Sequence, residues 1–155
     1  MSKFNDKVLV LGMDGLDPSL VNRFRAEGRM PNIDALIKKG STAKDLVMLG
    51  AVPTITPPMW TTLATGANPN THGITCFWQQ SKESLDTIAY AMNSRKCKAE
   101  QLWNVFAEAG QKTLVWHWPG SSWPPSSDNP NLYVVDGSQP AAVQMSTASV
   151  DFEKY

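Results

Sequence analysis

The sequence predicts an α/β fold built on a mainly parallel β-sheet with helices on both faces. Short, continuous apolar runs are typical of strands that are buried on both sides. Between these runs the chain offers prolines where helices begin and glycines where they end. The elements follow in the order strand, helix, strand, helix, helix, strand, which is typical of α/β domains. The 155 residues fit one domain, and no internal repeat or second domain is visible.

The first predicted strand is Val8–Met13, a run of sequence VLVLGM. Asp17 can cap the N-terminus of the next helix, because Pro18 follows at the first helical position. Apolar residues at helical spacing then give this helix one buried face, and Gly28 ends it. A second short helix begins at Pro31. The start of the chain therefore predicts a strand followed by two helices.

The second helix ends at Gly40, and Ala43–Leu49 is the next predicted strand. A third helix begins at Thr56, which two prolines follow, and ends at Gly66. We expect residues 67–73 (ANPNTHG) to form turns throughout. The polar stretch 81–98 gives no clear pattern. The remaining predicted elements are a helix and two strands: Glu100–Ala109, Thr113–Trp116 and Leu132–Val135.

Composition and charge exclude several classes of partner. Acidic and basic residues balance to a net charge of zero, so nucleic acid and anionic membranes are not expected as bulk partners. The longest apolar runs fall far short of the roughly 20 residues that span a bilayer. No signal peptide is recognisable at the N-terminus, so we expect a cytoplasmic protein. Cys76 and Cys97 could pair, but reduced thiols fit that location better.

Asp14 follows directly on the first predicted strand. Ligands of open α/β sheets gather at the carboxyl ends of strands, where a carboxylate can hold a metal or activate a nucleophile. The alternative is a simple Asp-Gly turn. The segment lacks the G-x-G-x-x-G spacing of a dinucleotide site. An aspartate-nucleophile phosphatase of the haloacid dehalogenase type needs a second Asp at the position of Leu16.

Thr56 ends an extended stretch and is expected to cap the third helix. Helix N-termini favour anionic groups, and a hydroxyl placed there can attack phosphorus. The alternative is an N-cap without a catalytic role. Pro57 and Pro58 have no N–H, so the donors left for a phosphate oxygen are mainly Thr56 and Met59. Metal ions are the natural source of the remaining stabilisation.

The two histidines are ambiguous. His72 lies in a turn-rich loop, where a structural role is the more common one and metal binding is the alternative. His117 stands between two tryptophans at a strand end and could face a pocket. No cluster of His, Cys and Asp has the spacing of a self-contained metal site.

Three segments form a specific combination: Val8–Gly15 (VLVLGMDG), Met30–Gly40 (MPNIDALIKKG) and Pro53–Ile74 (PTITPPMWTTLATGANPNTHGI). A strand ending in Asp-Gly is followed by M-P-N-I-x-x-L-x-x-x-G, T-x-P-x-W and T-G-x-x-P-x-x-H-G-I. In this order the segments resemble the alkaline phosphatase superfamily. The closer likeness is to its type I phosphodiesterase / nucleotide pyrophosphatase branch. The likeness extends over about the first half of the chain, from Val8 to Ile74.

The resemblance implies an alkaline-phosphatase-like domain with two divalent metal ions, usually zinc. Asp14 would bind one ion. Thr56 would bind the same ion and act as the nucleophile, forming a covalent phospho-threonine or nucleotidyl-threonine intermediate. Water activated at the other metal would then hydrolyse the intermediate. The substrate would be a small-molecule phosphate ester.

Two departures from the family pattern limit what the resemblance implies. Nucleotide pyrophosphatases carry a phosphate-contacting Asn after the His-Gly-Ile segment, and here Phe77 stands there, preceded by Cys76. The family also carries most of its metal-binding Asp and His residues far downstream. Asp136 and Asp151 lack the accompanying histidines. We therefore expect residues 1–155 to be the N-terminal part of a catalytic domain whose C-terminal half is missing.

Several functions remain open. A phosphonate hydrolase or a phosphoethanolamine transferase of the same superfamily would use the same threonine and metals. A sulfatase is disfavoured, because Thr56 cannot become formylglycine. A non-catalytic binding domain is the competing class. Met59, Phe77 and Trp118 are candidate substrate contacts, and Trp123 is a further candidate pocket wall.

Overall fold

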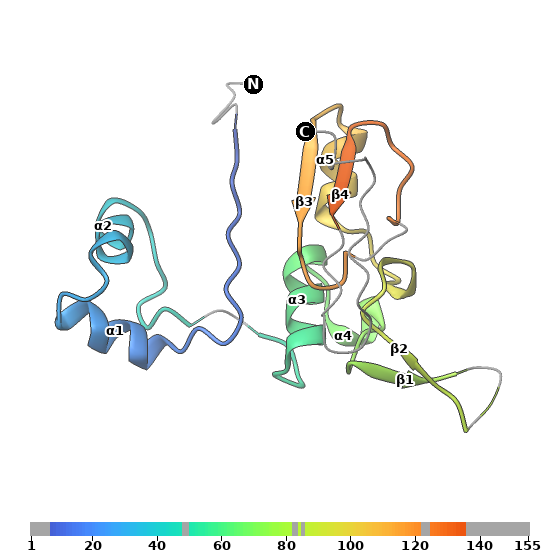
Figure 1. Ribbon diagram of the computed structural model, residues 1–155, viewed down its shortest axis with the longest axis horizontal. Helices are drawn as coiled ribbons and strands as arrows, with labels where there is room; N and C mark the ends of the chain where they lie inside the picture. Colours follow the sequence, from blue (N-terminus) through green and yellow to red (C-terminus); the bar gives the residue numbers. More distant parts are fainter. Residues whose placement is uncertain (1–6, 48–49, 82–83, 85, 122–124, 136–155) are drawn as a thin grey trace. The chain divides into compact units, whose positions relative to one another are not determined.

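The computed structural model describes residues 7–47, 50–81, 84, 86–121 and 125–135. The chain divides into two compact units, Met1–Leu49 and Gly50–Tyr155 (Figure 1). The first unit contains the helices α1 (Pro18–Ala26) and α2 (Pro31–Lys39). The second unit contains the other helices and all the strands of the described residues.

The predicted signals of α1 and α2 are confirmed. Asp17 caps α1, where its Oδ1 accepts hydrogen bonds from the N–H groups of Ser19 at 2.7 Å and Leu20 at 3.1 Å. A further hydrogen bond from the Ser19 hydroxyl is the main reason why the pKa of Asp17 lies below its usual value. Gly28 follows α1 with φ +70°, a conformation that favours glycine. Gly40 ends α2 as predicted.

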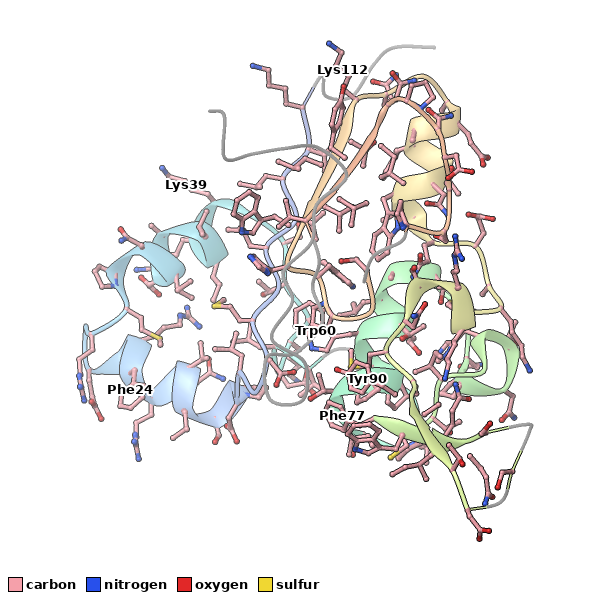
Figure 2. The ribbon with its side chains drawn as sticks, turned by 45° about the vertical axis from the view of Figure 1, so that its right-hand side comes forward. Phe24, Lys39, Trp60, Phe77, Tyr90 and Lys112 are labelled. Atoms are coloured by element: carbon pink, nitrogen blue, oxygen red, sulfur yellow. The ribbon has the colours of Figure 1, made fainter. Side chains whose placement is uncertain are left out.

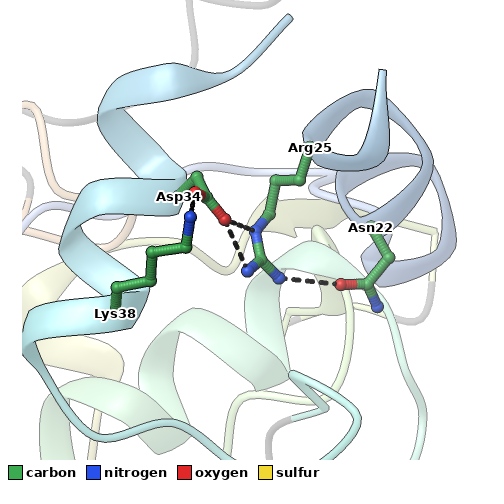
Figure 3. A network of polar contacts seen from close by, with 4 residues as sticks. All are labelled: Asn22, Arg25, Asp34 and Lys38. Atoms are coloured by element: carbon green, nitrogen blue, oxygen red, sulfur yellow. Dashed lines mark hydrogen bonds and ion pairs between the residues drawn. The ribbon is translucent and has the colours of Figure 1, made fainter. Parts of the chain in front are cut away.

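A network of charged side chains joins α1 to α2 (Figure 3). Arg25 on α1 donates through Nε and Nη2 to Asp34 Oδ1 on α2, at 3.2 and 2.8 Å. Asn22 Oδ1 accepts from Nη1 of the same arginine at 3.1 Å. The ammonium of Lys38 and then the guanidinium of Arg25 hold the pKa of Asp34 below its usual value. The ion pair between Arg25 and Asp34 therefore holds α1 and α2 together.

Both predicted strands of the first unit are absent from the described residues. Val8–Met13 has no strand partner there, and its apolar side chains are exposed, with Leu9 at 81%. The described part of Ala43–Leu49 contains a turn, and Leu46 has φ +61°. Apolar composition favours burial but does not supply the hydrogen-bonding neighbour that a strand requires. These two predictions are wrong for this structure.

The second unit begins with α3 (Thr56–Thr65), which ends at Gly66 as predicted, with φ +67°. The predicted turn after it instead contains a short helix, α4 (Pro69–His72). The polar stretch that gave no pattern contributes an antiparallel hairpin and a 3₁₀ turn. These elements are β1 (Trp78–Gln80), β2 (Ile88–Tyr90) and η1 (Ser94–Lys96). Helix α5 (Leu102–Glu108) falls inside the predicted helix.

Strands β3 (Thr113–Trp116) and β4 (Leu132–Val135) have the predicted bounds and pair in parallel. Thr113 pairs with Leu132 at one end and Trp116 with Val135 at the other. Helix α5 packs on one face of this sheet. The core cluster comprises six buried residues: Ala64, Trp103, Ala107, Val115, Leu132 and Val134.

The α/β class is confirmed, but the sheet is smaller than predicted. Among the described residues the parallel sheet has two strands, and helices do not cover both of its faces. Leu114 and Trp116 alternate with the buried Val115 and are 57% and 60% exposed. A parallel sheet is normally covered on both faces. Among the described residues, the parallel sheet is therefore incomplete for an α/β domain.

Two further findings bear on the sequence predictions. No helix among the described residues is both long enough and apolar enough to cross a membrane. Cys76 and Cys97 are free thiols, the first exposed and the second half-buried. Burial raises the pKa of the Cys97 thiol, and its Sγ donates to Ala99 O at 3.3 Å.

Candidate functional site

Thr56 occupies the first position of α3 and is half-buried. The residue that caps this helix is Ile55, with the extended backbone angles φ −122° and ψ 164°. The prediction that Thr56 is the N-cap is therefore displaced by one residue. Ile55 makes no side-chain cap hydrogen bond. The hydroxyl of Thr56 thus belongs to the first turn itself, at the positive end of the helix dipole.

The two prolines after Thr56 hold that turn in place. Pro57 and Pro58 are fully buried, and their rings fix φ near the helical value. Neither has an N–H. The N–H of Met59 donates to Ile55 O at 3.2 Å, so it already has an acceptor within the helix. The N–H of Met59 is consequently poorly placed to donate to a phosphate oxygen, which is the role that the sequence predicted for it.

The side chain of Met59 faces the segment that leads into α3. Its Sδ accepts from the N–H of Ala51 at 3.1 Å. A Cβ added at Gly50 would come within 2.9 Å of Met59 Cε. The thioether therefore packs against the backbone that precedes the helix.

His72 is a structural residue of the second unit. It is fully buried, and its Nδ1 accepts from the N–H of Ile74 at 3.1 Å. Its Nε2 must then carry the proton, and it lies 3.2 Å from Thr62 Oγ1 on α3. Burial lowers the pKa of this imidazole, which favours the neutral ring. Both nitrogens are committed to the fold, which confirms the structural interpretation over metal binding.

Trp118 packs into the core directly after β3. Its ring meets those of Trp60 on α3 and Trp103 on α5 edge to face, with centroids 4.8 and 6.0 Å apart. Trp60 is labelled in Figure 2. The buried Nε1 of Trp118 has no hydrogen-bond partner among the described residues. Trp118 thus packs the end of β3 against α3. Trp123 lies outside the described residues.

Phe77 is half-buried at the entrance to the β1–β2 hairpin (Figure 2). Its carbonyl accepts from the N–H of Ala91 at 2.7 Å, which extends the pairing of the two strands. A phenyl ring has no donor for a phosphate oxygen. At this position the chain therefore offers an apolar contact only.

Asp14 lies in the first unit, in an exposed turn with Gly15, whose φ is +66°. This geometry matches the Asp-Gly turn that was the alternative to a metal ligand, and the two roles are compatible. Thr56 belongs to the second unit. The approach of Asp14 to Thr56 stays a prediction.

His117 combines exposure with an unusual backbone. It follows β3 with φ +49°, a conformation uncommon for residues other than glycine. Its ring lies 5.5 Å from that of Trp116, centroid to centroid. Together with Trp118, it shows that the chain turns sharply at the carboxyl end of β3.

Comparison with known protein families identifies the family of this chain. The family model described as type I phosphodiesterase / nucleotide pyrophosphatase matches residues 8–154. The chain belongs to this family. The match extends well past Ile74, where the recognisable motifs end. Comparison with curated proteins gave no match, and neither did comparison with solved structures.

Because the chain belongs to this family, it matters which of its side chains could bind a metal ion. Asp14 and Thr56 provide the oxygen donors that suit divalent metals. Among the described residues, no group of three or more His, Cys, Asp or Glu side chains could hold a metal ion. Asp136 and Asp151 lie outside the described residues. The described donor set therefore does not fit a complete two-metal site.

Proposed function

We propose that this chain carries the nucleophile of a metal-dependent hydrolase acting on phosphate esters, of the phosphodiester or nucleotide type. The observation that supports the proposal best is the position of Thr56. Its hydroxyl stands in the first turn of α3, and two buried prolines immediately behind it hold the backbone rigid. A nucleophile that is fixed before the substrate arrives loses little entropy on the way to the transition state.

The reaction would proceed through a covalent intermediate on Thr56. The Oγ atom attacks phosphorus, an Oγ–P bond forms, and the ester bond to the leaving alcohol breaks. The proton of the hydroxyl leaves Oγ as the bond forms, and the departing alkoxide takes up a proton. Water then attacks phosphorus, the Oγ–P bond breaks, Oγ regains a proton that the water gives up, and the phosphate-containing product leaves. The dipole of α3 favours the negative charge that gathers beside its N-terminus.

Two divalent metal ions, zinc by family resemblance, would lower the pKa of the hydroxyl and neutralise charge on the phosphate oxygens. Asp14 is the proposed ligand of the ion next to Thr56. Because the described donors do not complete a site, the other ligands would come from the C-terminal half of the catalytic domain. That half is the partner this proposal requires.

The proposal is tested in the longest native chain with zinc and a chromogenic phosphodiester. Thr56→Ala should lower the rate by about three orders of magnitude or more, as expected when a nucleophile is removed. Thr56→Ser keeps a hydroxyl and should keep measurable activity. Thr71→Ala, at an exposed threonine of α4, is the matched control. Acid quenching during turnover should trap the phosphoryl group, still esterified to the remaining alcohol of the diester, on Thr56 alone, detected by peptide mass spectrometry. Unchanged turnover in Thr56→Ala would overturn the proposal.

A non-catalytic binding domain is the second candidate, and Phe77 is the observation that favours it. A phenyl ring stands where nucleotide pyrophosphatases have an amide donor, so one source of oxyanion stabilisation is replaced by an apolar contact. Phe77→Asn discriminates the two candidates in the longest native chain. For an enzyme adapted to other phosphate esters, the substitution should shift substrate preference without creating activity. For a binding domain, the unsubstituted protein and Phe77→Asn should both bind a phosphodiester, and neither should hydrolyse it.

A further inference from the structure

His117, directly after β3, has no role in the mechanism proposed above. Its side chain is exposed, whereas His72 is buried and uses both ring nitrogens within the fold. Among the described residues the ring of His117 contacts that of Trp116 and makes no hydrogen bond. The imidazole is therefore accessible to a molecule from solution.

The backbone of His117 is firmly held although its side chain is exposed. Its N–H donates to Val135 O at 3.2 Å, which continues the parallel pairing one residue past β3. Its φ of +49° is uncommon for a residue other than glycine and persists only where the surrounding structure enforces it. Residues 119–121 are buried, and Ser121 donates through N and Oγ to Trp118 O at 3.0 and 2.7 Å. The loop thus presents the imidazole from a rigid backbone.

The loop that carries this histidine also packs against α3 (Figure 1). The ring of Trp118 meets that of Trp60 with centroids 4.8 Å apart. A Cβ added at Gly120 would lie 3.9 Å from Thr61 Oγ1. Trp60 stands about one turn after Thr56, because an α-helix has about 3.6 residues per turn. The loop is therefore packed on the helix that begins with the proposed nucleophile.

The direction of the strands puts His117 at the edge of the sheet where ligands are expected. Strands β3 and β4 are parallel, so their carboxyl ends meet where Trp116 pairs with Val135. Ligands of open α/β sheets bind outside the carboxyl ends of the strands. His117 is the first residue beyond that edge on β3.

A phosphate ester beside Thr56 would find few donors among the described residues of the first turn of α3. The two prolines of that turn have no N–H, and the N–H of Met59 already donates to Ile55 O. Phe77 stands where nucleotide pyrophosphatases have an amide donor. An imidazole has at least one N–H in every protonation state it adopts near neutral pH. A hydrogen bond from such a group to a charged oxygen is among the stronger ones in proteins.

We propose that His117 binds a non-bridging phosphate oxygen of the substrate through a ring N–H, in place of the missing amide. This contact presupposes the proposed function, because the substrate is the phosphate ester that Thr56 attacks. The contact exists both before and during the attack. Its loss should therefore weaken substrate binding and lower kcat/KM together.

The contact is tested by calorimetric titration of the longest native chain with bis(p-nitrophenyl) phosphate in the presence of zinc. The Thr56→Ala background prevents the covalent step, so the titration measures binding. His117→Gly removes the imidazole and keeps the fold, since glycine adopts positive φ at no steric cost. The Kd should rise about tenfold or more, as expected for the loss of a hydrogen bond to a charged oxygen.

Two matched variants separate a donor from a structural residue. Asparagine and aspartate have the same shape and both tolerate the left-handed backbone, but only the amide donates when the carboxylate is ionised. His117→Asn should recover most of the affinity, and His117→Asp should bind at least as weakly as His117→Gly. Lys112→Gln, at an exposed lysine next to the amino end of β3 (Figure 2), should leave the Kd unchanged.

An unchanged Kd in His117→Gly would overturn the proposed contact. Equal affinities of His117→Asn and His117→Asp would also overturn it, because the effect would then belong to the loop and not to an N–H donor. Hydrolysis of the diester by Thr56→Ala would instead overturn the proposed nucleophile. Weaker binding by His117→Gly than by His117→Asn would support the contact even in that case.

Discussion

Replacing His72 by alanine should destabilise the second unit strongly. The substitution removes the acceptor of the buried Ile74 N–H, a loss worth about 1–3 kcal/mol. It also removes the contact with Thr62 Oγ1 and leaves a cavity, which together add roughly 1–2 kcal/mol. We expect the free energy of unfolding to fall by about 3 kcal/mol, a large part of the roughly 5–15 kcal/mol of a typical domain.

The measurement is urea unfolding followed by tryptophan fluorescence, because Trp60 and Trp103 are buried in the same unit. His72→Asn is the matched variant, since its Oδ1 can occupy the place of Nδ1 and accept from Ile74. It should lose about half as much stability as His72→Ala. Zinc should leave the stability difference between wild type and His72→Ala unchanged. An alanine variant as stable as wild type, or a zinc-dependent difference, would refute the structural role.

The same residue predicts a pH dependence. Burial lowers the pKa of His72 in the folded chain, so the unfolded chain binds its proton at a higher pH. Stability is then complete above the unfolded pKa of about 6.5 and falls as pH drops below it. The slope attributable to one histidine approaches about 1.4 kcal/mol per pH unit. His72→Asn should flatten the stability profile between about pH 6.5 and 5. An unchanged profile contradicts this assignment.

Two further predictions compare a residue with its neighbour. Trp118→Ala should lower the free energy of unfolding by about 3 kcal/mol, because its ring packs in the core. Trp116→Ala should lower it by less than about 1 kcal/mol, because that ring is exposed. Urea unfolding measures both changes. Lys38→Met should raise the pKa of Asp34 towards its usual value, because the ammonium is the main cause of its depression. Lys39→Met should leave that pKa unchanged in a carboxylate NMR titration, and equal effects of the two substitutions would contradict the assignment.

Local signals predicted the helices well. Asp17 and Pro18 mark the start of α1, and Gly66 marks the end of α3, because caps and left-handed residues act on their immediate neighbours. The bounds of β3 and β4 were also predictable, since their apolar runs are short and bounded by polar residues. The displacement of the α3 cap from Thr56 to Ile55 shows the one-residue limit of such reasoning.

Pairing could not be predicted from the same signals. Val8–Met13 is more apolar than β1 or β2, yet it lies exposed and unpaired within the described residues, while the polar hairpin forms. Strands depend on hydrogen bonds to residues distant in sequence, which composition does not identify. For the same reason, the partnership of Asp14 with Thr56 rests on the family resemblance.

The sequence by itself indicated the family, the candidate nucleophile and the ends of helices α1 and α2, because motifs and helix caps depend on residues that are adjacent in the chain. Only the tertiary structure decided that the Nε2 atom of His72 meets Thr62 on α3, and that Trp118 packs against Trp60 and Trp103. Each of these depends on which atoms meet across the fold. Burial makes these contacts important for stability, because a buried polar atom has lost its hydrogen bonds to water and needs a partner within the protein.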